Sequence, residues 1–176
     1  ILALPLRDGG SERFGVTICY EDLDADLFRL FVRDGARFMV NVTNDGWFRD
    51  SMELDEHLAV CAFRAVEHRL AVLRSVNTGI SCMVDTLGRI KDGYAAGNLP
   101  QKAFDRQGVV GWFADTVPID ARTTFFSKHG QWLDFACQLS VIVIIIAQIA
   151  ERFFLKRRTK GEKGSKINGD ETPGKK

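Results

Sequence analysis

Hydrophobic positions in the first 128 residues follow two patterns, one typical of buried strands and one typical of amphipathic helices. Short runs rich in apolar and β-branched residues at 14–19, 38–42, 71–76 and 81–85 predict four strands. Helical spacing after each of the first two runs predicts two helices. Their predicted apolar faces comprise Leu23, Leu27, Leu30 and Phe31 in the first helix and Leu54, Leu58, Cys61, Ala62 and Ala65 in the second. Alternating strands and helices favour an α/β layered domain over an all-β sandwich.

Turn and capping residues separate these predicted elements. Asp22 or Asp24 can accept hydrogen bonds from the first turn of the first helix, and Gly35 can end that helix in a left-handed conformation. Residues 44–47 (Asn-Asp-Gly-Trp) carry turn chemistry. Further turn chemistry lies at residues 77–79 and 85–88. We therefore expect alternating strands and helices first and hairpin-like strand pairs later in the chain.

A different pattern begins near Trp132. The sixteen residues from 135 to 150 carry no charge, and the apolar stretch from 132 to 155 is long enough to cross the ~30 Å core of a bilayer. Trp132 fits one membrane interface, and the basic residues 156–158 fit the cytoplasmic one, which weakens the alternative of a buried core helix. We predict a transmembrane helix at 132–155. The tail at 156–176 is expected to be cytoplasmic and disordered, with the globular part on the opposite side of the membrane.

Composition and charge narrow the classes of protein further. The chain has 176 residues, of which 45% are hydrophobic and 27% charged, which excludes wholesale disorder and a disulfide-stabilised miniprotein. Basic and acidic residues nearly balance, at 24 and 23, so we expect no nucleic-acid partner. Cys19, Cys61, Cys82 and Cys137 form no CxxC pair, which predicts separate thiols, no metal and no cofactor. Of these, Cys61 and Cys82 are expected in the core.

Cys19 ends the first predicted strand and precedes the first helix. A thiol there lies at a sheet edge beside helix N-terminal N–H groups, which favour a thiolate and can hold an oxyanion. The neighbouring acidic residues act in the opposite direction, because negative charge disfavours a thiolate. They are Glu21, Asp22, Asp24 and Asp26. From spacing alone, Cys19 is either a structural thiol or a nucleophile that needs a base and a cation from elsewhere in the fold.

Residues 16–22 (VTICYED) resemble the nucleophile segment of the carbon–nitrogen hydrolase, or nitrilase, superfamily. Further stretches follow in the order typical of that family. They are residues 34–36, 41–51, 57, 64–67, 74–81 and 84–90. The Asn-Asp-Gly-Trp-Phe loop at 44–48, joined to a C-terminal membrane helix, is similar to the apolipoprotein N-acyltransferases, the membrane branch of the superfamily. The resemblance extends from about residue 14 to residue 158.

The resemblance implies a four-layer α-β-β-α sandwich, of which residues 1–128 would form the C-terminal part, and a Glu-Lys-Cys catalytic triad. Cys19 matches the nucleophile, the backbone N–H of Tyr20 would join the oxyanion hole, and Glu21 would help to orient the site. The Glu and Lys of the family fall before Ile1. Since the chain also starts with Ile rather than Met, we expect a piece of a longer protein that is inactive by itself.

The resemblance also implies a reaction at the bacterial inner membrane, with the catalytic domain in the periplasm. Cys19 would take a fatty acyl group from a phospholipid as a thioester and pass it to the N-terminal amine of a diacylglyceryl-cysteine apolipoprotein. Asn44, Asp45 and Trp47 would line the acyl site, although a capped turn with one anchoring aromatic explains them equally well. A membrane-anchored nitrilase-type amidase that uses water and a non-catalytic membrane-tethered module are the alternatives.

Several other side chains have simple structural interpretations. Arg64 and Glu67 stand three residues apart on the second predicted helix, where a local ion pair is favoured over a place in the wall of the active site. His57, His68 and His129 lack the spacing of metal ligands, and we predict them on helix surfaces or in loops.

Overall fold

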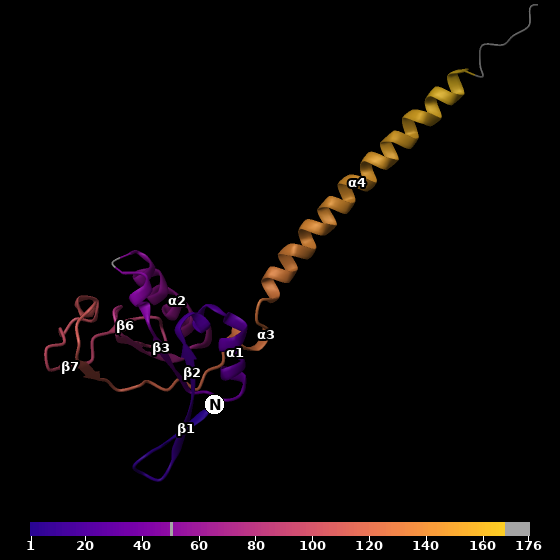
Figure 1. The fold of residues 1–176 in the computed structure, drawn as a ribbon. Helices are drawn as coiled ribbons and strands as arrows, with labels where there is room; N and C mark the ends of the chain where they lie inside the picture. The colour runs from indigo at the N-terminus through magenta and orange to yellow at the C-terminus, as the bar shows by residue number, and fades with distance from the viewer. Residues whose placement is uncertain (50, 168–176) are drawn as a thin grey trace, which may run out of the picture. The chain divides into compact units, whose positions relative to one another are not determined.

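The computed structural model describes residues 1–49 and 51–167. Two compact units are present, Ile1–Gly130 and Gln131–Lys176 (Figure 1). The first unit holds the sheets and the helices that pack on them, and the second holds one long helix. The α/β class predicted from alternating strands and helices is confirmed for the first unit.

Six strands of the first unit form one sheet, in the order in which they occur along the chain (Figure 1). They are β1 (Leu2–Pro5), β2 (Ser11–Ile18), β3 (Phe38–Thr43), β4 (Ala71–Val76), β5 (Cys82–Val84) and β6 (Ile90–Lys91). Strands β2, β3 and β4 are parallel because a helix makes each crossover, whereas β1, β5 and β6 pair antiparallel through short turns. The four predicted runs correspond to β2 through β5. The hydrophobic pattern misses β1, which is exposed throughout, and β6, which has two residues.

Helix α1 (Ala25–Arg33) connects β2 to β3 and has the predicted capping chemistry. The Asp24 Oδ1 atom accepts hydrogen bonds from two backbone N–H groups of the first turn, both at 3.0 Å, so Asp24 rather than Asp22 is the cap. Gly35 follows the helix with φ of 93°, a left-handed conformation that a residue without a Cβ adopts at little cost.

The buried face of α1 differs from the predicted one. Phe28 is fully buried and Leu27 and Phe31 are half-buried, whereas Leu23 and Leu30 are about half exposed. Successive helical residues point only about 100° apart, so an apolar pattern this short defines the face to within one residue. Contact with β2 and with the second helix decides which residue is buried.

Helix α2 (Glu53–His68) connects β3 to β4 and packs on the same sheet face as α1. Its buried side chains include Leu54, Leu58, Cys61 and Ala65, which confirms most of the predicted apolar face. The core between the helices and the sheet is one cluster of buried apolar side chains. Its members are Phe28, Ala36, Met39, Leu58, Cys61, Ala65, Leu70, Val72, Ile80, Cys82, Val84 and Ala103. This core fixes the position of α2 relative to the ends of the strands.

The opposite face of the sheet is less covered. Val16, Val40 and Leu73 are half-buried there, and Ile18 and Val42 are 65% and 47% exposed. Successive strand residues point to opposite faces, so these side chains alternate with the buried ones beneath the helices. The described residues thus form one helical layer on one main sheet, which is two of the four layers that the family resemblance implies.

A second, two-stranded sheet follows β6. It pairs β7 (Tyr94–Ala96) with β8 (Trp112–Ala114) in antiparallel fashion. Arg106 in the intervening segment is buried, and its guanidinium donates to the carbonyl oxygens of Ser81 and Pro100, both at 3.0 Å, and lies 4.9 Å from the centre of the Phe113 ring. This one side chain ties the segment to β5, although no local pattern in the sequence predicts it.

Helix α3 (Phe125–His129) ends the first unit. Thr124 caps it, and the Ser127 hydroxyl lies 2.8 Å from the His68 Nδ1 atom. The Arg29 guanidinium donates to the carbonyl oxygens of Ser127 and of the following residue, at 3.0 and 2.7 Å. The prediction of a surface His68 is wrong, because α3 and α1 cover it. Burial, reinforced by nearby arginines, lowers the pKa of His68 to about 4.

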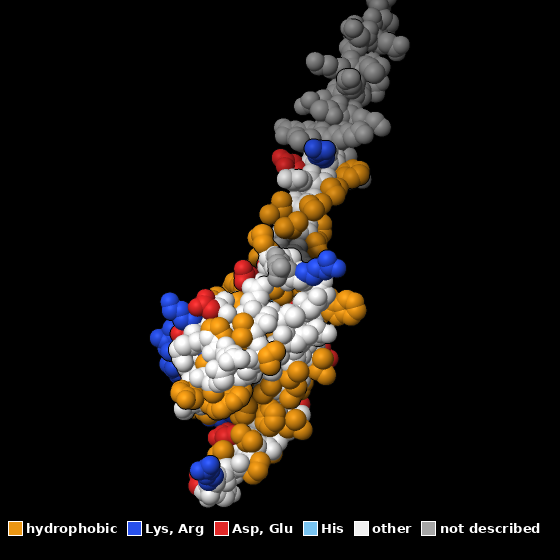
Figure 2. Space-filling view, turned by 60° about the vertical axis from the view of Figure 1, so that its left-hand side comes forward, with side chains coloured by type: hydrophobic (Ala, Val, Ile, Leu, Met, Phe, Trp, Pro, Cys, Tyr) orange, Lys and Arg blue, Asp and Glu red, His pale blue; other side chains and the backbone are white. Residues whose placement is uncertain are grey.

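Helix α4 (Trp132–Ile167) forms the second unit. Its first 22 residues, Trp132–Phe153, contain an 18-residue window with a mean hydropathy of 2.1, and none of that window is buried. Figure 2 shows hydrophobic side chains along this stretch. At a rise of about 1.5 Å per residue the stretch measures about 33 Å, against ~30 Å for a bilayer core. The predicted apolar segment is therefore a helix long and apolar enough to cross a membrane.

The predicted disordered tail begins at residue 156, but α4 continues to Ile167. Residues 156–167 are thus helical where irregular structure is expected, and residues 168–176 lie outside the described part of the chain. Lysine, arginine and glutamate lose little rotamer freedom in a helix, and extending an existing helix needs no new nucleus.

Candidate active site

Cys19 lies at the carboxyl end of β2, where the parallel strands of an α/β sheet commonly bind ligands. It opens the 3-10 turn η1 (Cys19–Leu23) with φ of 53°, a left-handed conformation that costs a non-glycine residue about 1–3 kcal/mol. Asn41 on β3 donates from Nδ2 to the Cys19 carbonyl oxygen at 3.1 Å. The thiol is free and partly exposed. The position, backbone conformation and partial exposure of Cys19 are compatible with the predicted role of nucleophile.

The two residues after Cys19 hold the turn in different ways. The Tyr20 hydroxyl donates to Glu53 at 2.6 Å, and the Tyr20 ring stacks on His57 with centroids 4.4 Å apart. Burial and the Glu53 carboxylate raise the pKa of Tyr20 far above its usual range, so the phenol stays a donor. Glu21 accepts a hydrogen bond from the Ile18 backbone N–H at 2.8 Å. Both predicted supporting residues therefore lie beside Cys19 and stabilise its turn.

The predicted acyl-site loop lies at the end of the neighbouring strand β3. Asn44 accepts hydrogen bonds from the Gly46 N–H at 3.1 Å and from Asn77 Nδ2 at 2.6 Å, so a capped turn is present. Trp47 is 83% exposed and does not anchor this turn, contrary to the structural interpretation of the loop. Asp45 is fully buried, and its side chain joins a group of charged residues beneath the turn.

That group, called the buried charge cluster below, consists of Asp22, Asp45, His57 and Arg74. All four side chains are 0% exposed. The His57 ring bridges the two carboxylates, with Nε2 3.0 Å from Asp22 Oδ1 and Nδ1 3.0 Å from Asp45 Oδ1. Arg74 on β4 donates to Asp45 at 2.8 Å and lies 3.7 Å from Asp22. The cluster thereby connects η1, the loop after β3, α2 and β4.

The buried charge cluster pairs acidic with basic side chains. Asp45 contacts both Arg74 and His57, and Asp22 contacts His57. Mutual pairing of this kind is the condition for burying ionisable side chains away from water. Across residues 1–49 and 51–167, no group of three or more His, Cys, Asp and Glu side chains is placed to hold a metal ion.

The buried position of His57 corrects the prediction of a surface or loop histidine. A signal for burial was nevertheless present, because His57 stands three residues after Leu54 and four before Cys61, on the predicted apolar face of α2. The identity of its partners carried no such signal, since Asp22, Asp45 and Arg74 come from three other elements. His129 is exposed, as predicted.

The remaining predicted thiols and ion pair have structural positions. Cys61 and Cys82 are fully buried, and burial raises the pKa of Cys82 to about 11 and that of Cys61 further above its usual range. The Cys61 thiol donates to Asp22 at 2.9 Å. Arg64 and Glu67 form the expected local ion pair at 3.0 Å.

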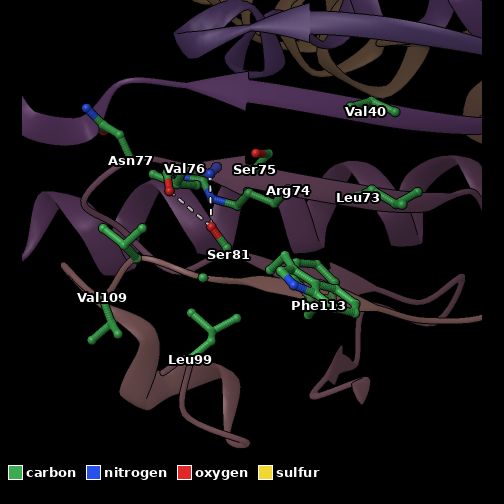
Figure 3. Close-up of a pocket in the computed structure, with 13 residues that line it drawn as sticks. Val40, Leu73, Arg74, Ser75, Val76, Asn77, Ser81, Leu99, Val109 and Phe113 are labelled. Carbon is green, nitrogen blue, oxygen red and sulfur yellow. Dashed lines mark hydrogen bonds between the residues drawn. The ribbon is translucent and has the colours of Figure 1, made fainter. Parts of the chain in front are cut away.

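A cavity of about 520 Å³ opens on the less covered face of the sheet, between β3, β4 and the segment that leads into β8 (Figure 3). Val40 and Leu73 lie on its sheet side and Leu99 and Val109 opposite them, while Ser81 hydrogen-bonds the backbone of Val76 at one wall (Figure 3). Among the described residues that line it, none is a predicted site residue. Arg74 of the buried charge cluster and Asn77, which donates to Asn44, do line the cavity, so it adjoins the loop after β3.

The chain belongs to the carbon-nitrogen hydrolase family, whose model matches residues 3–112. It is 33% identical over 137 residues to an apolipoprotein N-acyltransferase of Geobacter metallireducens, covering 78% of this chain and 24% of that protein. It is 36% identical over 146 residues to the apolipoprotein N-acyltransferase of Thermotoga maritima, covering 82% and 26%. The chain thus spans about a quarter of the length of these relatives. Saccharomyces cerevisiae Nit3, of branch 10 of the nitrilase superfamily, is a solved structure with 24% identity and a TM-score of 0.38 over 51% of this chain and 34% of that one.

Proposed function

We propose that this chain forms part of an enzyme that transfers a fatty acyl group from a phospholipid to the N-terminal amine of a diacylglyceryl-cysteine apolipoprotein. Cys19 is the proposed nucleophile. The supporting observation is that one chain combines a strained cysteine at a strand end with an apolar helix long enough to cross a membrane. The names of the relatives point to the same reaction.

The proposed chemistry has two steps. In the first, the Cys19 sulfur attacks the ester carbonyl carbon of the phospholipid, a carbon–sulfur bond forms, and the carbon–oxygen bond breaks to release the lysolipid, which takes up the thiol proton. In the second, the acceptor amine attacks the carbonyl carbon of the thioester, a carbon–nitrogen bond forms, and the carbon–sulfur bond breaks. The amine loses a proton, and the sulfur takes one up to regenerate the thiol. The family resemblance assigns proton transfer to a Glu and stabilisation of the tetrahedral anion to a Lys. No residue of this chain is assigned to either role, so we expect the chain to be inactive by itself.

The setting of the proposed reaction is a bacterial inner membrane. Both substrates are lipids, so an anchored active site lets the acyl group pass between them without crossing water. The basic residues 156–158 directly after the apolar stretch support a cytoplasmic end for α4 and a periplasmic catalytic domain. In this proposal Tyr20 and Glu21 support the nucleophile turn, and Asn44 and Trp47 face the acyl site.

A second candidate follows from the family itself. Carbon-nitrogen hydrolase membership over residues 3–112 is equally compatible with an anchored amidase in which water attacks the acyl-enzyme. That enzyme would turn over small amides without lipid, whereas the transferase requires a phospholipid donor and an amine acceptor.

The test is acyl transfer by the complete protein, with phosphatidylethanolamine in mixed micelles and a diacylglyceryl-cysteine peptide as acceptor. We expect an acyl adduct on Cys19 by mass spectrometry and an acylated peptide, and neither product with Cys19→Ala. The control is Cys82→Ala, which removes a core thiol that lies away from η1 and leaves turnover intact. Full turnover by Cys19→Ala would refute the proposal, and turnover of small amides alone would favour the amidase.

A further inference from the structure

The proposed reaction leaves the buried charge cluster unused. Burying ionisable side chains away from water is costly, and apolar residues of similar volume commonly pack at least as stably in such positions. The cluster lies directly beneath η1, the turn that begins with Cys19. The contacts between the buried charge cluster and η1 therefore show which part of the chain the cluster holds in place.

One face of α2 contacts the nucleophile turn at three successive levels. Glu53, His57 and Cys61 are spaced four residues apart and so lie one above another on the helix. Glu53 accepts from the Tyr20 hydroxyl at 2.6 Å, His57 stacks on the Tyr20 ring and bonds Asp22 at 3.0 Å, and Cys61 donates to Asp22 at 2.9 Å. Of the three, His57 alone contacts both Tyr20 and Asp22.

We propose that His57 is a positioning residue for Cys19, which holds η1 in the conformation that presents the thiol. This inference rests on the proposed function of Cys19 as nucleophile. The left-handed φ of 53° at Cys19 is strained, and such a conformation persists only where the surrounding structure fixes it. His57 fixes η1 at two points, the side chains of Tyr20 and Asp22, which both belong to this turn.

The choice of histidine follows from the geometry. Its two ring nitrogens lie on opposite sides of the ring and hydrogen-bond Asp22 in η1 and Asp45 in the loop after β3, each at 3.0 Å. A glutamine carries both of its donors on one nitrogen and cannot bridge the two carboxylates in this way. His57 thereby links the nucleophile turn to the loop that carries Asn44 and Trp47, and Arg74 donates to the same Asp45 at 2.8 Å.

The test is His57→Gln in the complete protein, given phosphatidylethanolamine but no acceptor. We expect the single-turnover rate of acyl-Cys19 formation to fall about tenfold to a hundredfold, because small misplacements of a reacting group have effects of this size. The lipid concentration for half-saturation should stay unchanged, since His57 does not touch the lipid. Hydrogen–deuterium exchange of the backbone amides of residues 19–23 should become faster.

The matched control is His68→Gln on the same helix. His68 is as buried as His57, but it contacts Ser127 and not η1. Its replacement should lower stability while leaving both the acylation rate and the exchange at residues 19–23 as in the wild type. If His57→Gln does not fold, Asp22→Asn takes its place, because it weakens the same link and the remaining charges can still balance.

The outcomes separate this inference from the proposed function. A wild-type protein that forms no acyl-Cys19 refutes the proposed function, and exchange at residues 19–23 still tests whether His57 holds the turn. A wild type that acylates Cys19 while His57→Gln does so at the same rate overturns the positioning role, as does unchanged exchange in that variant.

Discussion

Arg74→Met is the substitution with the largest expected effect on the stability of the first unit. The side chain is 0% exposed and lies 2.8 Å from Asp45 and 3.7 Å from Asp22. Methionine fills a similar volume without a charge. The buried charge cluster would then lack its guanidinium, which leaves the Asp45 carboxylate without its arginine partner and out of reach of water.

The magnitude follows from the distances. At an effective dielectric constant of about 20, unit charges 2.8 Å apart attract by about 6 kcal/mol. In the native protein desolvation offsets much of this attraction, but removing one partner leaves the desolvation of the other uncompensated, which costs about 3–5 kcal/mol. The contrasting change is Arg37→Gln, whose partner Glu12 lies 3.9 Å away with both side chains more than 30% exposed. It should cost less than about 1 kcal/mol.

The assay is urea unfolding of the complete protein in mild detergent, with proteolytic cleavage within residues 1–130 as the measure of unfolding. Adding Asp45→Asn to Arg74→Met removes the carboxylate that has lost its arginine partner, so the double variant should be more stable than Arg74→Met alone. The electrostatic reasoning fails if Arg74→Met loses less than about 1 kcal/mol, or if the double variant is no more stable than the single one.

Two further predictions concern buried titratable groups. Burial lowers the pKa of His68 in the folded protein to about 4, from 6.5 for an exposed histidine, so between these pH values only the unfolded chain binds the proton. The free energy of unfolding should therefore fall by up to about 3 kcal/mol from pH 6.5 to 4. In urea unfolding, His68→Gln should show a weaker dependence of this free energy on pH. The same pH dependence in the variant and the wild type would contradict the prediction. Iodoacetamide at neutral pH should alkylate Cys19 and spare Cys61 and Cys82, whose pKa values burial raises; peptide mapping that finds native-state Cys61 modified would disprove this.

Local patterns predicted the elements that bury a continuous apolar face. Strands β2 to β5 each contain a run of apolar residues, and helix α2 carries Leu54, Leu58 and Cys61 at helical spacing. Burial of these faces is visible in the sequence, so these elements are predicted correctly. The exposed strand β1 and the segment between β7 and β8, which Arg106 holds in place, show no such pattern, so the sequence does not predict them. The buried face of α1 was displaced by one position, from Leu27 to Phe28, because contact with β2 and α2 decides it.

The candidate site divides in the same way. Cys19, Tyr20 and Glu21 are neighbours along the chain, so their placement in one turn could be expected from the sequence. Asp45, which was expected at a capped turn or in the acyl site, points instead into the buried charge cluster. His57 joins it from α2, against the expectation of a surface position.

The sequence alone predicts the features that depend on residues close together along the chain. These are an α/β domain, a cysteine at a strand end, and a long apolar helix followed by basic residues. Only the tertiary structure decides which charged side chains contact one another. Asp22, Asp45, His57 and Arg74 come from four elements spread over more than fifty positions, and only parallel pairing of β2, β3 and β4 under α2 brings them within hydrogen-bonding distance. A charged side chain looks the same in a sequence whether water or another ion neutralises it, and the difference becomes visible only when the surroundings are known.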